Sequence, residues 1–286
     1  MAERTSRLRA ILLMVAAVGI FSAMDALMKH LTAFYPPLQI ACLRGASSLP
    51  FVFLAYAATG RLGQLRPRRF HLHLVRAALA ILMLWGFVWA LARASLTDTY
   101  AVYMSAPLLV VLAASILLGE KTNRHVWAAI LVGLAGVWVM LKPTASGFAS
   151  LAGLAALASA LAYALVVVMV RVMSATETTG SMVFWFLLML ALGAGALATP
   201  RWVAIAAPHL PWIFGVGLAG WAGQHLITEA FRLAPASTVA PYEYMALVWG
   251  LGIDWFVWNT LPGVRVLAGA AIVVAAGLYL LHRERR

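Results

Sequence analysis

The chain has 286 residues, of which 64% are hydrophobic and 10% charged, and its formal net charge is +12. Soluble domains are about 45–50% apolar and about 25% charged, so this composition excludes an ordinary soluble protein and indicates an integral membrane protein. The basic residues lie in short connections and at the ends of apolar stretches, which favours membrane topology over a nucleic-acid partner. A single cysteine, Cys42, excludes a disulfide framework.

Turn-rich breaks divide the chain into ten apolar segments, and an α-helix needs roughly 20 such residues to cross a bilayer. In chain order we predict helices over residues 8–30, 35–59, 70–92, 97–118, 124–141, 149–173, 178–198, 208–231, 237–258 and 263–281. The sequence therefore predicts an all-α integral membrane protein with ten transmembrane helices.

The basic residues are unevenly distributed between the two sides of this arrangement. With both termini in the cytoplasm, fourteen Lys and Arg residues lie on the cytoplasmic side and five on the other. Cytoplasmic connections carry the excess of Lys and Arg in multispanning proteins. We therefore predict that both termini are cytoplasmic.

Two stretches within the membrane repeat each other. Residues 94–141 align without a gap with residues 235–282 at an offset of 141, which pairs Thr97 with Thr238 and Tyr103 with Tyr244. Five helices per unit is an odd number, so the second copy enters the membrane from the opposite side. We predict two inverted five-helix repeats, residues 1–143 and 149–286, which is typical of transporters with a site near the membrane midplane.

Two runs resemble a known family. A-P-L-L-V-V-L-A-A-S-I-L-L-G-E-K at 106–121 and A-F-R-L-A-P-A-S-T-V-A-P-Y-E-Y-M-A-L-V-W-G at 230–250 resemble the fourth and ninth helices of EamA-type ten-helix members of the drug/metabolite transporter superfamily. The resemblance covers essentially the whole chain and implies a bacterial inner-membrane transporter. Within the family, the aromatic richness is most similar to that of aromatic amino-acid exporters. One departure is N-T-L-P at 259–262, where many relatives carry a second Gly-Glu, and it weakens any transfer of a role to Glu120.

Ionisable side chains inside the membrane are functional candidates, because each costs about 2.5–3.5 kcal/mol to insert. Asp25 and Lys29 are spaced i,i+4, which favours either a simple salt bridge or a coupling role. Glu229 and Arg232 are spaced i,i+3, which is compatible with a gate-fixing ion pair or a substrate contact. Glu243 stands between two tyrosines on a predicted helix, where a charge is hard to explain by architecture alone.

Other positions leave two interpretations open. Arg44 has no sequence neighbour of opposite charge, so it must pair across helices, reach a carbonyl group or face water. His225 is either a neutral core histidine or a proton relay beside Glu229. Pro107 and Pro241 remove backbone hydrogen bonds within helices and predict either gating hinges or fixed bends. Glycines at 215, 217, 220 and 223 imitate a dinucleotide fingerprint, but their apolar helix favours close helix packing instead.

Aromatic side chains cluster in the helices that line the cavity in this family. A pocket needs apolar walls with a few polar groups, although lipid contact also explains single aromatics. The symmetric pair Tyr103 and Tyr244 favours a pocket, because matched positions of inverted repeats approach the same axis. The predicted substrate-binding residues are Trp85, Trp89, Tyr100, Tyr103, Tyr163, Trp221, His225, Glu243 and Tyr244. The predicted gating or coupling residues are Asp25, Lys29, Pro107, Glu229 and Pro241.

These observations and the resemblance predict a secondary transporter that exports amino acids, aromatic or large neutral, by alternating access. A G-x-x-x-x-G-K-[ST] loop is absent from the sequence, so ATP does not drive it directly. The alternative is an exporter of cationic drugs or polyamines coupled to protons, with Asp25 neutralising the cargo. We expect no enzymatic activity, cofactor or metal, a small-molecule cargo and the lipid bilayer as partners, and a monomer or weak homo-oligomer.

Overall fold

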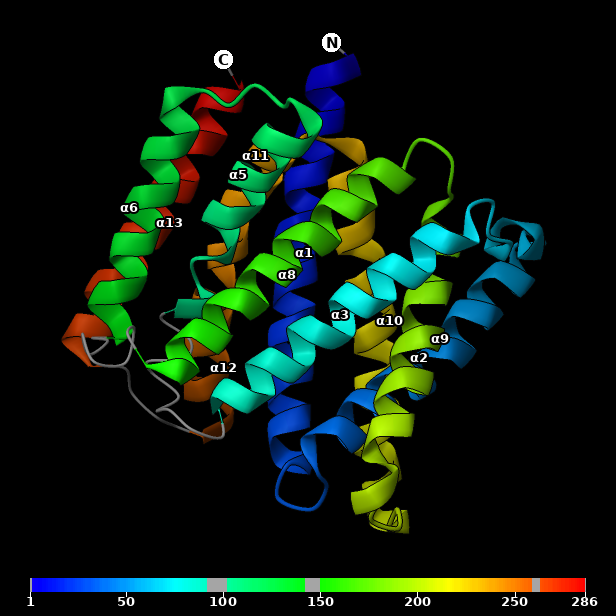
Figure 1. Ribbon diagram of the computed structural model, residues 1–286. Helices are drawn as coiled ribbons and strands as arrows, with labels where there is room; N and C mark the ends of the chain where they lie inside the picture. Colours follow the sequence, from blue (N-terminus) through cyan, green and yellow to red (C-terminus); the bar gives the residue numbers. More distant parts are fainter. Residues whose placement is uncertain (1, 92–101, 142–149, 259–262, 286) are drawn as a thin grey trace.

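The computed structural model describes residues 2–91, 102–141, 150–258 and 263–285, and within these ranges the chain is helical without strands (Figure 1). The main elements of the first half are α1 (Ala2–Leu31), α2 (Pro37–Ala58), α3 (Phe70–Leu91), α5 (Ala106–Leu118) and α6 (Arg124–Leu141). Those of the second half are α8 (Leu151–Met173), α9 (Thr179–Ala198), α10 (Leu210–Leu233), α11 (Ala236–Val239), α12 (Met245–Trp258) and α13 (Val264–Arg285). Short 3₁₀ turns connect them: η1 (Leu62–Leu65), η2 (Thr199–Arg201), η3 (Ala207–His209) and η4 (Ala240–Tyr244).

The helices are those of a membrane protein. Five described helices, α1, α2, α3, α8 and α9, are long and apolar enough to cross a bilayer, and α5, α6 and α13 contribute shorter apolar stretches. Each of the ten predicted segments corresponds to a described helix or an interrupted helix, with α1 beginning several residues earlier than predicted. The predicted all-α, ten-helix membrane fold is confirmed.

The two halves are arranged as inverted copies. In Figure 1, α1 runs away from the end that holds both termini, whereas α8, the first helix of the second half, runs toward it. The largest contacts between the halves have counterparts under their exchange: α1 packs on α10 as α3 packs on α8, α2 packs on α10 as α3 packs on α9, and α1 packs on α12 as α5 packs on α8. The remaining large contacts, α2 with α9 and α6 with α13, join equivalent helices. Residues 142–149 lie outside the described ranges, so the predicted division there stays a prediction.

The ninth predicted helix differs from the expectation of a continuous helix over 237–258. It consists of α11, then the 3₁₀ segment η4, then α12. Pro241 lies in the first turn of η4, and because proline has no backbone N–H, the α-helical bond at that position is missing. In the first half, Met104 and Ser105 form a turn before α5, whose first turn contains Pro107. Both prolines therefore occur at helix breaks, and their role as hinges stays a prediction.

Glycines allow α10 to approach α1 and α2 closely. A Cβ atom added at Gly220 would lie 2.6 Å from the Ser48 Oγ atom of α2, and one added at Gly223 would lie 2.7 Å from the Phe21 ring of α1. Real Cβ atoms do not come so close to other atoms, so larger residues would push these helices apart. The close packing predicted from the glycine spacing is confirmed.

Candidate functional site

Two opposite charges face each other in the interior between α1 and α2. Asp25 of α1 and Arg44 of α2 attract each other electrostatically, but the described side chains form no direct ion pair between them. The Arg44 guanidinium carbon lies 5.2 Å from the centre of the Phe21 ring, and its buried Nε atom has no hydrogen-bond partner among the described atoms. Asp25 is exposed by surface area although it lies well within α1. A guanidinium with an unpartnered Nε atom, beside an accessible carboxylate, can bind a molecule that carries both charges.

Aromatic rings extend from this pair into the second half. Tyr103 interacts electrostatically with Arg44. Its ring centre lies 4.8 Å from that of Phe87 on α3 and 6.5 Å from that of Tyr163 on α8. Tyr163 in turn interacts electrostatically with Glu243 on η4. Six segments of the chain, from α1 to η4, therefore bring a carboxylate, a guanidinium, three rings and a second carboxyl group into one region.

A cavity of about 630 Å³ lies at the end of the molecule that holds the termini. It is lined by residues of α1, α2, η1, the α8–α9 connection and the carboxyl-terminal part of α10, among them Arg9, Tyr56, His225 and Glu229. Its polar lining, open to the aqueous side, suits an entrance for a hydrated cargo rather than a lipid contact. His225 and Glu229, predicted as a binding and a gating residue, both face this entrance.

Glu229 makes two side-chain contacts at the entrance. Its Oε2 atom accepts a hydrogen bond from the Thr179 hydroxyl of α9 and one from Arg232 Nε at 3.1 Å. The ion pair predicted from the i,i+3 spacing is confirmed. The Nδ1 atom of His225, one turn earlier on α10, is buried without a hydrogen-bond partner in the described structure.

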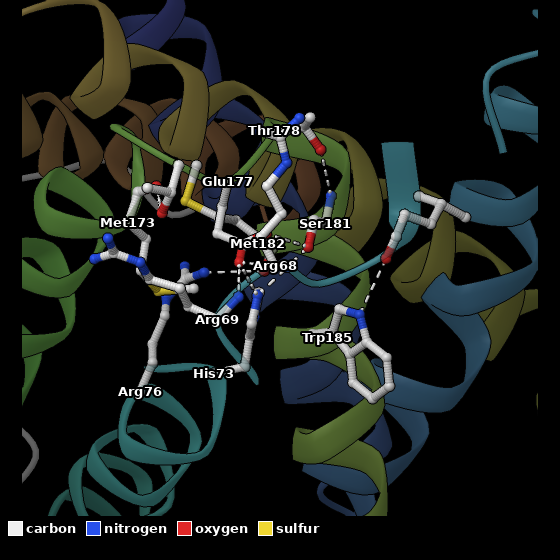
Figure 2. A network of polar contacts seen from close by, with 12 residues as sticks. Arg68, Arg69, His73, Arg76, Met173, Glu177, Thr178, Ser181, Met182 and Trp185 are labelled. Carbon is white, nitrogen blue, oxygen red and sulfur yellow. Dashed lines mark hydrogen bonds and ion pairs between the residues drawn. The ribbon is translucent and has the colours of Figure 1, made fainter. Parts of the chain in front are cut away.

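A second carboxylate holds the α2–α3 connection against the start of α9, as Figure 2 shows. Glu177 is 4% exposed and accepts hydrogen bonds from the backbone of Arg68 (2.7 Å) and Arg69 (2.6 Å) and from Ser181 Oγ (3.0 Å), with His73 Nε2 at 3.6 Å. Burial alone would raise the pKa of Glu177, but the hydrogen bonds from Arg69, Ser181 and Arg68 and the nearby His73 lower it below its ordinary value. This carboxylate stays ionised at neutral pH and fixes the two connections.

A third carboxylate links the two halves at the same end. Glu120, just after α5, accepts a hydrogen bond from Arg171 Nε of α8 at 2.9 Å and one from the backbone N–H of Ala236, at the start of α11, at 2.9 Å. Arg171 also donates to the carbonyl of Phe231 at 3.1 Å. We call Glu120, Arg171 and Ala236 the carboxylate latch. It joins the end of the fourth predicted helix to the sixth and the ninth.

The opposite end is held by neutral contacts. The Tyr35 hydroxyl lies 2.7 Å from His209 Nδ1 and accepts a hydrogen bond from the Ala206 N–H at 3.0 Å. Gln39 forms two hydrogen bonds with the backbone of Val203, one donated by its Nε2 (2.6 Å) and one accepted by its Oε1 (2.9 Å). Aromatic rings pack around these contacts, including those of His209 and Phe34 at 4.2 Å.

The predicted binding residues are not all brought together. Tyr103 lies near Arg44, and Tyr163 lies beside the Tyr103 ring. Tyr244 is 2% exposed and packs among apolar residues of α6 and α13, so its surroundings differ from those of its repeat partner Tyr103. Trp85 is 53% exposed on α3, as expected for a lipid contact, and Trp221 is stacked on Phe51 at 6.3 Å. Trp89 on α3 is partly buried.

Some predictions fall where the structure gives no description. Tyr100 lies outside the described ranges, and so does the side chain of Lys29, so its expected pairing with Asp25 stays a prediction.

Sequence reasoning missed the Glu177 network and gave Arg44 no binding role. In the sequence, Glu177 resembles a surface residue in a connection, and its partner His73 lies near a predicted cytoplasmic loop. Nothing local in the sequence pairs them, because Glu177 and the Arg68–Arg69 backbone are more than 100 residues apart. For Arg44 the signal was present, since an intramembrane arginine without a local counter-charge calls for a tertiary or ligand partner.

Inverted halves, a charged interior and a polar entrance at one end define a multi-pass membrane transporter. Residues 8–142 match the EamA-like transporter family. The chain is 29% identical to the pseudopaline exporter CntI of Pseudomonas aeruginosa. The aligned 277 residues make up 96% of each chain. The chain is also 29% identical to a riboflavin transporter of Vibrio cholerae (88% of this chain, 85% of the relative) and 26% identical to an S-adenosylmethionine uptake transporter of Rickettsia bellii (93% and 90%).

A solved crystal structure shares the fold. It superposes with a TM-score of 0.84 over 97% of this chain and 99% of the other at 20% identity. The three named relatives carry different cargoes, and none of them is described as an aromatic amino-acid exporter. The relatives are all transporters by name, and their names give three different cargoes.

Proposed function

We propose that this transporter exports an amino acid, aromatic or large neutral, from the cytoplasm across the bacterial inner membrane by alternating access. The observation that carries the proposal is the buried, unpartnered Nε atom of Arg44 near the accessible Asp25 carboxylate. An amino acid is a zwitterion, so its carboxylate would pair with Arg44 and its ammonium group with Asp25. The two charged groups would then satisfy each other through the cargo.

The rings beside Arg44 support a cargo with an apolar side chain. Phe21, Phe87, Tyr103 and Tyr163 offer flat apolar faces next to the charged pair. Transport sites combine such walls with a few polar groups that fix orientation. This arrangement agrees with the resemblance to the aromatic amino-acid exporter YddG expected from the sequence.

Export is favoured by the orientation that the basic residues predict. With the termini in the cytoplasm, the cavity of about 630 Å³ opens to the cytoplasmic side, where a metabolite made in the cell would enter. The relatives include one protein named an exporter and one named an uptake transporter, so direction depends on the driving gradient as well as on the fold.

A second candidate is export of a cationic drug or polyamine. Asp25 and Glu243 are interior carboxyl groups that could neutralise such a cargo. Under this alternative Arg44 would repel the cargo and would have to stay paired with Asp25. The role of Arg44 therefore separates the two candidates.

Counterflow in liposomes tests the proposal. Purified protein is reconstituted with unlabelled amino acids inside, and the entry of labelled phenylalanine, leucine, lysine and putrescine is followed. We expect counterflow of phenylalanine and leucine, and a loss of about tenfold or more in Arg44→Gln, because a charged hydrogen bond to the cargo is removed. Leu82→Ala, at a 51% exposed position on α3, serves as the control.

Two outcomes would count against amino-acid export. Counterflow of putrescine or lysine alone, retained in Arg44→Gln and lost in Asp25→Asn, would support the cation exporter. Phenylalanine counterflow that is equal in Arg44→Gln and the parent protein would remove Arg44 from the site.

A further inference from the structure

Glu243 occupies an unusual position in the interior. It lies on η4, where the ninth helix is interrupted, and is partly buried. Its Oε1 atom is buried without a hydrogen-bond partner in the described part of the chain, and the carboxyl group interacts electrostatically with Tyr163 of α8. By contrast, Glu120, Glu177 and Glu229 each have a basic side chain within 4.0 Å.

The elements packed around η4 supply no cation at this level. η4 packs against α1, α5, α6, α11, α12 and α13. α5 and α11 contain no ionisable residue, and the basic residues of α1, α6 and α13 lie near the helix ends. The other ionisable residues of these elements are Glu3 and Asp25 on α1, Asp254 on α12, Tyr279 and Glu284 on α13, and Tyr242 and Tyr244 beside Glu243, and α8 adds Tyr163. The groups in this set are acidic, and none of them can neutralise a carboxylate. Arg44 belongs to α2, which is not among the elements packed on η4, and it interacts electrostatically with Asp25.

An ionised carboxylate without a cation is costly in such surroundings, whereas a neutral carboxylic acid is much less so. A protonated carboxyl group can also donate a hydrogen bond, which an ionised one cannot. We propose that Glu243 carries a proton in this conformation and that the transporter exchanges this proton for its cargo. The inference rests on the proposed function, since it requires a cargo to exchange.

The chemistry is a proton transfer alone. The Glu243 O–H bond breaks and the proton leaves to water on one side of the membrane, and the carboxylate takes a proton from water on the other side. No other bond changes. The interruption at η4 allows the segment that carries Glu243 to change its exposure without unfolding the adjoining helices.

Contacts between α1 and the ninth helix connect this proton to the cargo site. Ser22 Oγ of α1 donates to the carbonyl of Ala246 at 3.3 Å. Ser22 lies one turn before Asp25, and Ala246 lies three residues after Glu243. Trp249 Nε1 also donates to the Val15 carbonyl at 3.2 Å. A shift of α1 as cargo binds Asp25 therefore moves the segment next to Glu243.

The test uses full-length protein in liposomes, with the membrane potential clamped by potassium and valinomycin. Counterflow at equal pH first identifies a transported amino acid, with phenylalanine as the first probe. An interior one pH unit more acidic than the outside is then imposed, with no internal substrate. Exchange of one proton per cargo predicts about tenfold accumulation of the labelled amino acid at equilibrium. Normal counterflow without accumulation would overturn the inference and leave the proposed function standing, whereas absent counterflow would overturn the proposed function itself.

Variants assign the proton to Glu243. Glu243→Gln should reduce the accumulation driven by the pH gradient from about tenfold to onefold, because a carboxamide cannot take up and release a proton at this site. The accumulation at equilibrium does not depend on the rate of exchange, so a variant that is merely slower would still reach about tenfold. Glu243→Asp should keep it, which also covers the case that the glutamine variant does not fold. Tyr163→Phe should shift the pH dependence of counterflow, because the hydroxyl partner is lost. Glu284→Gln, near the carboxyl terminus, is the matched control. Tenfold accumulation by Glu243→Gln, or its loss in Glu243→Asp, would contradict the assignment.

Discussion

At the end that holds both termini, three carboxylates join the connections: Glu120 binds Arg171 and Ala236, Glu177 binds the α2–α3 connection, and Glu229 binds Arg232. At the opposite end the described contacts are neutral, with Tyr35 on His209 and Gln39 on Val203. The two halves share one fold, but the residues at their ends do not follow the repeat. Different interactions hold the two ends, so we expect the stability of each end to respond differently to salt, pH and substitution.

The largest effect is expected at the most buried carboxylate. Glu177→Gln should lower the free energy of unfolding by about 3 kcal/mol, because two backbone donors and His73 lose their ionised acceptor inside the protein. Denaturant unfolding in detergent, followed by tryptophan fluorescence, measures this change. Glu284→Gln, which removes a carboxylate from the chain end, is the control. A Glu177→Gln protein as stable as the control would show that the network does not hold this end together.

The same carboxylate should make the stability of this end fall in acid. The pKa of Glu177 is lowered from the ordinary value of 4.5. Its contribution to the free energy of unfolding is therefore fully present above pH 4.5 and is lost as the pH falls through the lowered pKa. We expect this part of the stability to be constant from pH 7 to about pH 5 and to fall below that. Unfolding curves of the parent and Glu177→Gln at several pH values should converge in acid. Parallel curves at all pH values would contradict the assignment.

The carboxylate latch should give the next largest effect. Glu120→Gln and Arg171→Gln, with the double variant, form a cycle in which we expect a coupling free energy of about 2 kcal/mol. Because both side chains are partly accessible, about 0.5 M salt should weaken the coupling. A coupling near zero would mean that the backbone contact with Ala236 alone holds Glu120.

At the opposite end a smaller and salt-independent loss is expected. Tyr35→Phe removes a hydroxyl that contacts His209 and Ala206, which should cost about 1 kcal/mol of unfolding free energy. The matched control is Tyr279→Phe, since the Tyr279 hydroxyl makes a similar contact with His125 Nδ1 at 2.9 Å in an exposed position. Equal losses in the two variants, or a loss that changes with salt, would remove the contrast between the ends.

The smallest effect concerns the exposed ion pair. The Arg232 side chain is 39% exposed, so Arg232→Gln should cost about 0.5 kcal/mol and the cost should vanish at high salt. Glu229 keeps its bond with Thr179 in this variant. Unfolding at low and high salt measures the difference. A salt-independent loss above about 1.5 kcal/mol would show that Arg232 has a further role in the structure.

The sequence alone predicts the helices and the inverted halves, because hydrophobic length and repeat spacing are local or periodic signals. It also predicts the Glu229–Arg232 pair, since i,i+3 neighbours meet on any helix. The interruption of the ninth helix at η4 was indicated only as a kink at Pro241. How far a proline disrupts a helix depends on the neighbouring helices that satisfy the freed groups.

The candidate site was predicted less well. Tyr103 and Tyr244 are equivalent in the repeat, yet Tyr244 packs against Gly133, where the missing side chain leaves room for its ring. The structure places Arg44 near Asp25, although no sequence spacing relates α1 to α2. Which side chains meet across helices depends on rotation and tilt, and these are set by packing that the hydrophobic pattern does not record.

The burial of Arg76 affects how the protein is made. This residue on α3 is 2% exposed, its guanidinium carbon lies 4.8 Å from the Phe186 ring centre, and its NH1 donates to the Met182 carbonyl at 2.9 Å. Both partners belong to α9, which the ribosome completes more than 100 residues later. During synthesis α3 must therefore enter the bilayer with a charge whose partners do not yet exist. The first five helices therefore cannot bury Arg76 with its partners on their own, and the first half reaches its final structure only after the second half is synthesised and inserted.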